Sequence, residues 1–171
     1  MVLAGDIGAT KSLLAYFSPK GYARTALNEK SFWSQKYPGL EAVLRTFLAS
    51  HPAEVKIACF GLPGPVVDGR CETPNLPWVV DLRKLKVVLG NAQIILLNDL
   101  QIMAYGIPTL RPDELYALSE GKPHPEGNQA LIAPGTGLGE AILFFDGMEH
   151  KPVALRYLYS SKRPRPETTR S

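Results

Sequence analysis

Three short apolar runs, each predicted to be a strand, end in turns built from acidic or glycine residues. The runs cover residues 2–7, 93–97 and 130–133, and they lead into Gly8-Ala9-Thr10, Asn98-Asp99 and Gly135-Thr136-Gly137. Such turns present backbone N–H groups and short polar side chains at the carboxyl end of a strand. An acid such as Asp6 at the end of an apolar strand is costly unless it is paired, solvated or close to a cation. The pattern therefore favours a fold whose strands deliver polar turns to a ligand site.

The first half of the sequence adds further strands and an amphipathic helix. Residues 11–17 are expected to pair with residues 2–7 as a β-hairpin, and the polar segment 22–33 adds a third strand. A helix is predicted over residues 38–50, with Pro38 in its first turn, from apolar residues at helical spacing: Leu40, Val43, Leu44, Phe47 and Leu48. Strands and helices together place the chain in the α/β class.

The second half continues the same alternation up to residue 154. We expect a strand at 55–60, a short helix starting near Asp81, the clearest core strand at 93–97 and a helix after Asp99. The segment 108–128, rich in Pro, Gly and charge, is interpreted as a hinge or inter-domain crossing. Asp146-Gly147 is a hairpin turn signal, so a strand should return after it.

Composition and charge exclude several classes of protein. The 171 residues are 45% apolar and 20% charged, which allows a packed core of one domain or two small ones. We find no apolar run of about 18 residues, so no membrane span is expected. Asp6 interrupts the apolar N-terminal stretch, which argues against a secretory signal. Cys59 and Cys71 are too few for a disulfide framework and lack metal-ligand spacing, so a reducing cytoplasm is expected.

The basic charge of the chain is confined to its end. Residues 151–171 carry six basic side chains and one acid, which leaves 13 basic and 15 acidic residues in the first 150, a net charge of −2. The pI near 8.9 therefore reflects the tail and gives no support for specific nucleic-acid binding. Residues 155–171 are expected to be disordered, because their last twelve positions offer no apolar side chain other than proline to bury.

Two glycine-rich turns are candidates for binding phosphate. In the first, Asp6 could hold a magnesium ion through water, while Thr10 and the amides from Gly8 onward could hold phosphate oxygens. In the second, Thr136 could add its hydroxyl, but Glu140 occupies the sixth position, where a dinucleotide fingerprint needs glycine. An ordinary hairpin turn is the alternative for each one alone. Two such turns in one chain favour a phosphate clamp.

Asn98-Asp99 has two possible interpretations. A carboxylate at the mouth of a cleft is placed to accept a proton from a hydroxyl nucleophile, and an amide beside it suits a sugar hydroxyl. The alternative is helix capping, because Asn and Asp are preferred N-caps and a helix is predicted here. The segment 75–78 could line a sugar pocket, whereas Trp33 and Trp78 are expected to be packing residues, and Ser12 is interpreted as structural.

Four ordered blocks resemble the bacterial glucokinases, members of the actin-like ATPase superfamily. They are Leu3–Lys11, Pro63–Val66 with Asn75–Trp78, Leu97–Leu100 with Met103–Gly106, and Ala133–Gly139. One departure is Ala9, where the family usually has glycine and where a methyl group would crowd the phosphate turn. The resemblance implies ribonuclease-H-like domains, each a mixed sheet with flanking helices, with ATP and glucose in the cleft between two of them. Residues 1–109 would form the first domain and 110–154 the incomplete start of the second.

The resemblance also implies a reaction and assigns roles. Phosphoryl transfer from Mg·ATP to the 6-hydroxyl of glucose would use Asp99 as general base, with Asp6 placing the magnesium through water. Sugar contacts are expected from Asn75, Asn98, Asp99 and Gly135. ATP phosphate contacts are expected from Gly5, Asp6, Ile7, Gly8, Ala9, Thr10, Thr136 and Gly137.

The sequence departs from the resemblance after Ala154. Similar proteins continue into a Ser-Glu-Gly-Gly-His segment that holds the sugar, whereas here the basic tail follows. We therefore expect a frameshifted or truncated second domain and impaired or absent activity. The rival hypotheses are a non-catalytic sugar-binding or regulatory protein and a partly folded remnant that exposes apolar surface. The sequence leaves a homodimer open.

Overall fold

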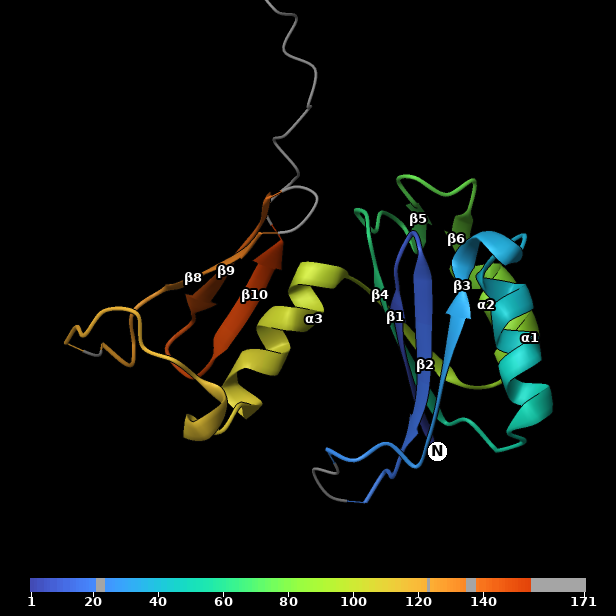
Figure 1. The fold of residues 1–171 in the computed structure, drawn as a ribbon, viewed down its shortest axis with the longest axis horizontal. Coiled ribbons are helices and arrows are strands. Elements are labelled where there is room, and N and C mark those ends of the chain that lie inside the picture. The colour runs from blue at the N-terminus through green and yellow to red at the C-terminus, as the bar shows by residue number, and fades with distance from the viewer. Residues whose placement is uncertain (21–23, 123, 135–137, 155–171) are drawn as a thin grey trace, which may run out of the picture.

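The computed structural model describes residues 1–20, 24–122, 124–134 and 138–154 (Figure 1). Its elements, in chain order, are β1 (Val2–Ile7), β2 (Lys11–Phe17), β3 (Asn28–Trp33), η1 (Ser34–Lys36), α1 (Leu40–Ser50), β4 (Ile57–Leu62), β5 (Arg70–Glu72), β6 (Val79–Asp81), α2 (Leu82–Leu89), β7 (Gln93–Asn98), α3 (Asp99–Gly106), η2 (Ile107–Thr109), η3 (Pro112–Glu114), β8 (Gln129–Pro134), β9 (Leu138–Phe145) and β10 (His150–Ala154). The third strand thus begins at Asn28, later than the predicted start at residue 22. No helix among the described residues is long and apolar enough to cross a membrane.

A five-stranded mixed sheet organises the first hundred residues. Its strand order is β3-β2-β1-β4-β7, in which β1 to β3 pair antiparallel while β1, β4 and β7 run parallel. The predicted hairpin of the first two strands is confirmed, with Ile7 opposite Ser12. Because β1, β4 and β7 are parallel, their carboxyl ends meet at one edge of the sheet.

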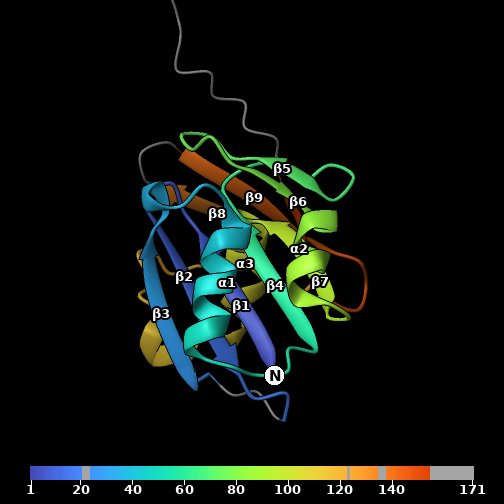
Figure 2. The same cartoon turned by 90° about the vertical axis from the view of Figure 1, so that its right-hand side faces the viewer.

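Helices α1 and α2 cover one face of this sheet (Figures 1 and 2). The predicted apolar stripe of α1 is buried at Leu40, Val43, Leu44 and Phe47. The helix begins at Leu40 with Gly39 as its N-cap, so Pro38 precedes the helix and does not lie in its first turn. Asp81 caps α2, as expected for a helix starting there, by accepting a hydrogen bond from the Arg83 N–H at 2.8 Å.

Two expectations about packing are corrected. Strand β7, predicted as the clearest core strand, is the edge strand of the sheet, and Ile94–Leu97 are only half-buried because β4 flanks β7 on one side alone. Trp33 is 53% exposed on the opposite edge strand, where the ammonium of Lys11 lies 4.8 Å from its ring centroid. Trp78 is buried as predicted, and its indole N–H donates to the Tyr37 carbonyl at 2.9 Å.

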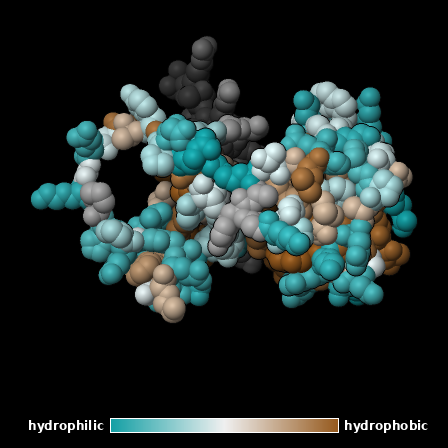
Figure 3. Space-filling view, turned by 90° about the horizontal axis from the view of Figure 1, so that it is seen from below, coloured by the Kyte–Doolittle hydropathy of each residue, from teal (hydrophilic) through white to brown (hydrophobic). Residues whose placement is uncertain are grey.

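A second, three-stranded antiparallel sheet packs on α3 in the order β10-β9-β8 (Figure 1). Alternate residues of β9, Gly139, Ala141 and Leu143, are buried, as expected for a strand with one covered face. The return of β10 after Asp146-Gly147 confirms the predicted hairpin. Between α3 and β8 the described residues form only two short 3-10 helices, η2 and η3. Seen from below, apolar surface gathers mainly on the part of the molecule that the five-stranded sheet and its helices build (Figure 3). The domain boundary at residue 109 stays a prediction.

Candidate active site

The candidate site is built where the three parallel strands end. Register places Asp6 of β1 beside Gly61 of β4, and the next residue of β4, Leu62, beside Asn98 of β7. A Cβ on Gly61 would lie 3.0 Å from the Cδ1 of Ile102, a tight contact with the end of a side chain, and 3.8 Å from the Asp99 Cα, so α3 begins close to β4. Helix α3 starts directly after the last residue of β7, so the Asp99 carboxylate lies at the same edge of the sheet as Asp6.

Asp99 is half-buried, and its surroundings favour the protonated form of its carboxyl group. Burial raises the pKa of its carboxyl group above the usual value, and the nearby negative charge of Asp6 raises it further. The N–H of Leu100 opposes these effects by donating to the carboxylate at 2.9 Å. A carboxylate with a raised pKa is a better base at neutral pH, so the geometry and the charge both suit general-base chemistry.

Asp6 is the last residue but one of β1 and has an exposed side chain, yet desolvation by its surroundings raises the pKa of its carboxyl group as well. Among the residues that the structure describes, no group of three or more His, Cys, Asp or Glu side chains could hold a metal ion. A magnesium ion here would therefore take most of its ligands from water and from nucleotide phosphates. Mg²⁺ favours this mode of binding, so the residues fit an ion that arrives with ATP.

The helix-capping interpretation of Asn98 is confirmed. Its side-chain oxygen accepts from the Leu100 N–H at 3.0 Å, and Gln101 completes a capping box by accepting from the Asn98 N–H at 3.1 Å. The side-chain amide also donates to the Gly64 carbonyl at 3.3 Å. Asn98 therefore fixes both the start of α3 and the loop after β4. Its contact with sugar hydroxyls stays a prediction.

The turn after β1 is tight, and only glycine fits at position 8. The Gly8 N–H donates to the Lys11 carbonyl at 2.9 Å, and a Cβ on Gly8 would lie 2.8 Å from that same oxygen. Ala9 is half-buried and packs against the hydrophobic core. The Thr10 side chain is exposed, and the crowding of the phosphate turn by the Ala9 methyl group stays a prediction.

Two buried hydroxyls support this turn from β2 and η1. Ser34 and Ser12 are both 0% exposed, and their oxygens lie 2.9 Å apart. The structural interpretation of Ser12 is thereby confirmed. The contribution of Ser34 was not predicted, since no motif marks it and only the register of β3 against β2 brings it to the Gly8 turn.

The predicted sugar-pocket segment lies in the turn between β5 and β6. Asn75 is exposed there with a φ of 65°, a conformation that asparagine tolerates better than most residues. Thr73 holds the turn by donating to the Trp78 carbonyl at 3.0 Å. The loop after β4 seats closely on this hairpin, because a Cβ on Gly64 would lie 2.9 Å from the Glu72 carbonyl. The side-chain amide of Asn98 donates to the Gly64 carbonyl, so the block that contains Pro63–Val66 is in direct contact with the block that contains Leu97–Leu100.

Gly135, Thr136 and Gly137 lie outside the described residues. The strands that flank them are described, and β9 begins against the start of α3. A Cβ on Gly139 would lie 2.8 Å from a methyl carbon of Leu100, the residue that follows Asp99. Gly139 and the start of β9 therefore pack against the helix that carries the candidate base.

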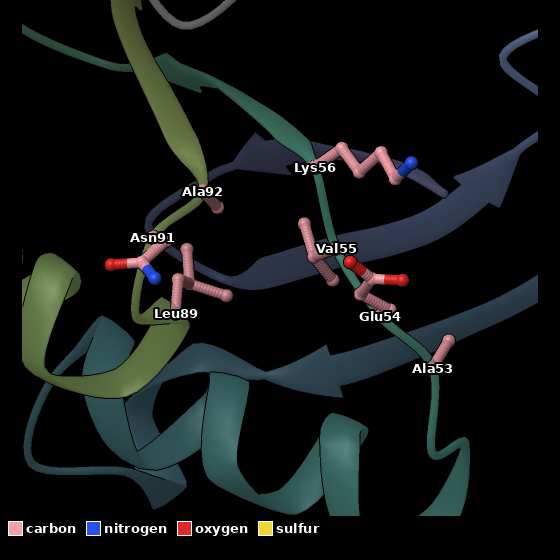
Figure 4. Close-up of a pocket in the computed structure, with 7 residues that line it drawn as sticks. All are labelled: Ala53, Glu54, Val55, Lys56, Leu89, Asn91 and Ala92. Atoms are coloured by element: carbon pink, nitrogen blue, oxygen red, sulfur yellow. The ribbon is translucent and has the colours of Figure 1, made fainter.

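A shallow pocket of about 520 Å³ lies at the opposite end of the sheet (Figure 4). Its lining residues precede β4 and β7 and include Val55, Lys56 and Ala92. The amino ends of parallel strands lie away from the edge that holds Asp6 and Asp99, so this pocket is separate from the candidate site.

Comparisons with known proteins agree with the geometry. The family model described as Glucokinase matches residues 3–155. The glucokinase of Nostoc punctiforme is 35% identical over 154 residues, covering 88% of this chain and 45% of the relative. The chain therefore spans about half the length of the curated relatives it matches.

Solved structures confirm the predicted fold, a ribonuclease-H-like domain of the actin-like ATPase type. A glucokinase from an Antarctic psychrotroph superposes with a TM-score of 0.78 at 25% identity, over 90% of this chain and 49% of that one. A glucokinase from Streptomyces griseus in complex with glucose and AMPPNP gives a TM-score of 0.57 at 21% identity, over 90% of this chain and 48% of that one. With the family match over residues 3–155, these likenesses show that the chain belongs to the glucokinase family.

Proposed function

We propose that the carboxyl edge of β1, β4 and β7 binds glucose and Mg·ATP for phosphoryl transfer to the sugar 6-hydroxyl. One observation carries the proposal. The half-buried carboxylate of Asp99, with its raised pKa, lies near Asp6 at the edge where the Gly8 turn follows β1. A base and a phosphate-binding turn at one edge are the two parts that this transfer needs on one side of a cleft. The Streptomyces griseus relative, which was solved with glucose and AMPPNP, supports the same pair of ligands.

In the proposed reaction Asp99 accepts the proton of the sugar hydroxyl. The hydroxyl oxygen then forms a bond to the γ-phosphorus, the bond from that phosphorus to the β–γ bridging oxygen breaks, and ADP leaves. Desolvation of Asp99 strengthens it as a base, and the nearby charge of Asp6 acts in the same direction. Capping by Asn98 holds the start of α3, so the carboxylate is positioned before substrate binds.

The phosphate side of the proposal uses the turn after β1 and the acid that precedes it. Ala9 and Thr10 would offer N–H groups to the phosphates, since nests of successive amides bind anions. Magnesium, when bound with the nucleotide, neutralises phosphate charge, and Asp6 would hold it through water. Thr136 and Gly137, which lie outside the described residues, are proposed to close on the phosphates from the second glycine segment.

We further propose that this chain binds its ligands but turns over slowly. It spans 45% of the length of its Nostoc punctiforme relative, and phosphoryl transfer depends on positioning from both sides of a cleft. Turnover above about 1 per second, a usual enzyme rate, would contradict this part of the proposal.

Calorimetric titration of the purified chain with glucose and with Mg·ATP, alone and together, tests the binding proposal. We expect both ligands to release or absorb heat, and Asp99→Ala to weaken glucose binding. Asp113→Ala is the matched control, because Asp113 is an exposed acid in η3. Equal effects of the two substitutions, or no heat from either ligand with a folded sample, would refute the proposal. A coupled assay of ADP release measures turnover on the same sample.

A further inference from the structure

Ser34 holds the backbone of the phosphate turn at two points. Its hydroxyl donates to the Gly8 carbonyl at 2.7 Å, and its N–H donates to the Thr10 carbonyl at 3.0 Å. Because the single hydroxyl proton of Ser34 is used on Gly8, the 2.9 Å contact with Ser12 is a bond donated by Ser12 to Ser34. One residue of η1 thus fastens both sides of a turn that is distant from it in the sequence.

These bonds set the direction of the Ala9 amide, the next N–H of the turn. The peptide bonds of the described residues are trans, and in a trans peptide the carbonyl and the next N–H point in opposite directions. Holding the Gly8 carbonyl toward Ser34 therefore turns the Ala9 N–H away from the buried serine pair. Amides stabilise an anion best when their direction is fixed before the anion arrives.

The burial of the two serines argues for more than space filling. A hydroxyl buried without partners costs free energy, whereas a buried apolar side chain needs no hydrogen-bond partner. Both side chains are 0% exposed, and their bonds run in one chain from Ser12 through Ser34 to the Gly8 carbonyl. The chain of bonds ends at the turn itself, so its effect is to hold the turn.

We infer that Ser34 is a positioning residue for nucleotide phosphate, which acts by aiming the Ala9 amide out of the Gly8 turn. This inference rests on the proposed function, because it assumes that the turn receives the phosphates of Mg·ATP. It assigns a role to a residue outside the glycine motif, at the start of η1, directly after the edge strand β3.

The test compares Ser34→Ala with Ser12→Ala, two identical changes at equally buried positions. Only the first removes the bond to the Gly8 carbonyl. We expect Ser34→Ala to weaken Mg·ATP binding about tenfold, the worth of one such hydrogen bond, while glucose affinity stays within about twofold. Ser12→Ala keeps the bond from Ser34 to the Gly8 carbonyl, so it should weaken Mg·ATP binding less than Ser34→Ala does and leave glucose affinity within about twofold.

A second readout does not depend on nucleotide binding. The Gly8 N–H, which is bonded to the Lys11 carbonyl at 2.9 Å, should exchange with solvent faster in Ser34→Ala than in Ser12→Ala. Unchanged Gly8 exchange in Ser34→Ala, or equal losses of glucose and Mg·ATP affinity in both variants, would overturn the inference. If the original chain binds no Mg·ATP, the proposed function fails and the exchange result alone decides whether Ser34 holds the turn. Ser34→Cys, which keeps the volume but donates weakly, replaces Ser34→Ala if the latter does not fold.

Discussion

Gly5 provides a sharp test of how β1 is seated between its neighbours. A Cβ at this position would lie 2.6 Å from a ring carbon of Phe60 and 2.9 Å from a methyl carbon of Leu14. The first distance is about 0.8 Å short of the 3.4 Å at which ordinary contact begins. Both neighbours are 0% exposed, so neither side chain can move into solvent. Gly5→Ala must therefore push β1 away from β4 or force Phe60 off its rotamer.

Overpacking of this kind costs about 1–3 kcal/mol, which for a domain of this size corresponds to a fall in Tm of roughly 2–12 °C. The displaced segment also carries the next residue, Asp6, whose position opposite Gly61 builds the candidate site. We therefore expect Gly5→Ala to weaken Mg·ATP binding as well as stability. A methyl group added to a glycine with free space around it would weaken neither.

Urea unfolding followed by tryptophan fluorescence measures the effect, because Trp78 is buried and reports loss of the core. Gly106→Ala is the matched control: a Cβ there meets nothing within 4 Å, and its backbone suits alanine. The control should gain about 0.4–1 kcal/mol from the lower entropy of the unfolded chain. Gly5→Ala that unfolds within about 0.5 kcal/mol of the original chain would refute the close packing of β1 described above.

For three further substitutions, the structure of the site and of the β9–β10 hairpin predicts whether stability rises or falls. Because the pKa of Asp99 is raised in the folded chain, ionisation of this carboxyl group destabilises the fold as pH rises past 3.8. Asp99→Asn should therefore increase stability at pH 7 but not near pH 3, and urea unfolding midpoints at the two pH values measure the difference. Asn98→Ala removes the cap of α3 and the donor to Gly64, and we expect a loss of about 1–3 kcal/mol in the same assay, which a neutral result would contradict. The hydrogen bond from Lys151 holds the pKa of Asp146 well below its usual range. The ionised Asp146 carboxylate therefore stabilises the fold above pH 3.8, and this stabilisation is lost in stronger acid. Asp146→Asn should remove that acid-dependent loss, measured by thermal unfolding at several pH values.

Much of the candidate site could be predicted from contiguous residues. The glycine turn after β1 and the Asn98-Asp99 pair could be identified because in each case the apolar strand pattern and the turn residues that follow it lie within a few positions of each other in the sequence. The same local logic predicted the start of α2 near Asp81 and the hairpin at Asp146. The cap at Asn98 was an open alternative, because a single sequence does not show which partners an asparagine finds when the chain folds.

The sequence by itself determined the kinds of element, their order and the turns that end them, since these depend on residues that are neighbours in the chain. Only the tertiary structure decided that Asp6 and Asp99 share one edge, that β7 lies at the border of the sheet, and that Ser34 reaches the Gly8 turn. The physical reason is that strand order and register depend on pairing between distant segments. Burial of a whole face selects that pairing, and no local pattern encodes it.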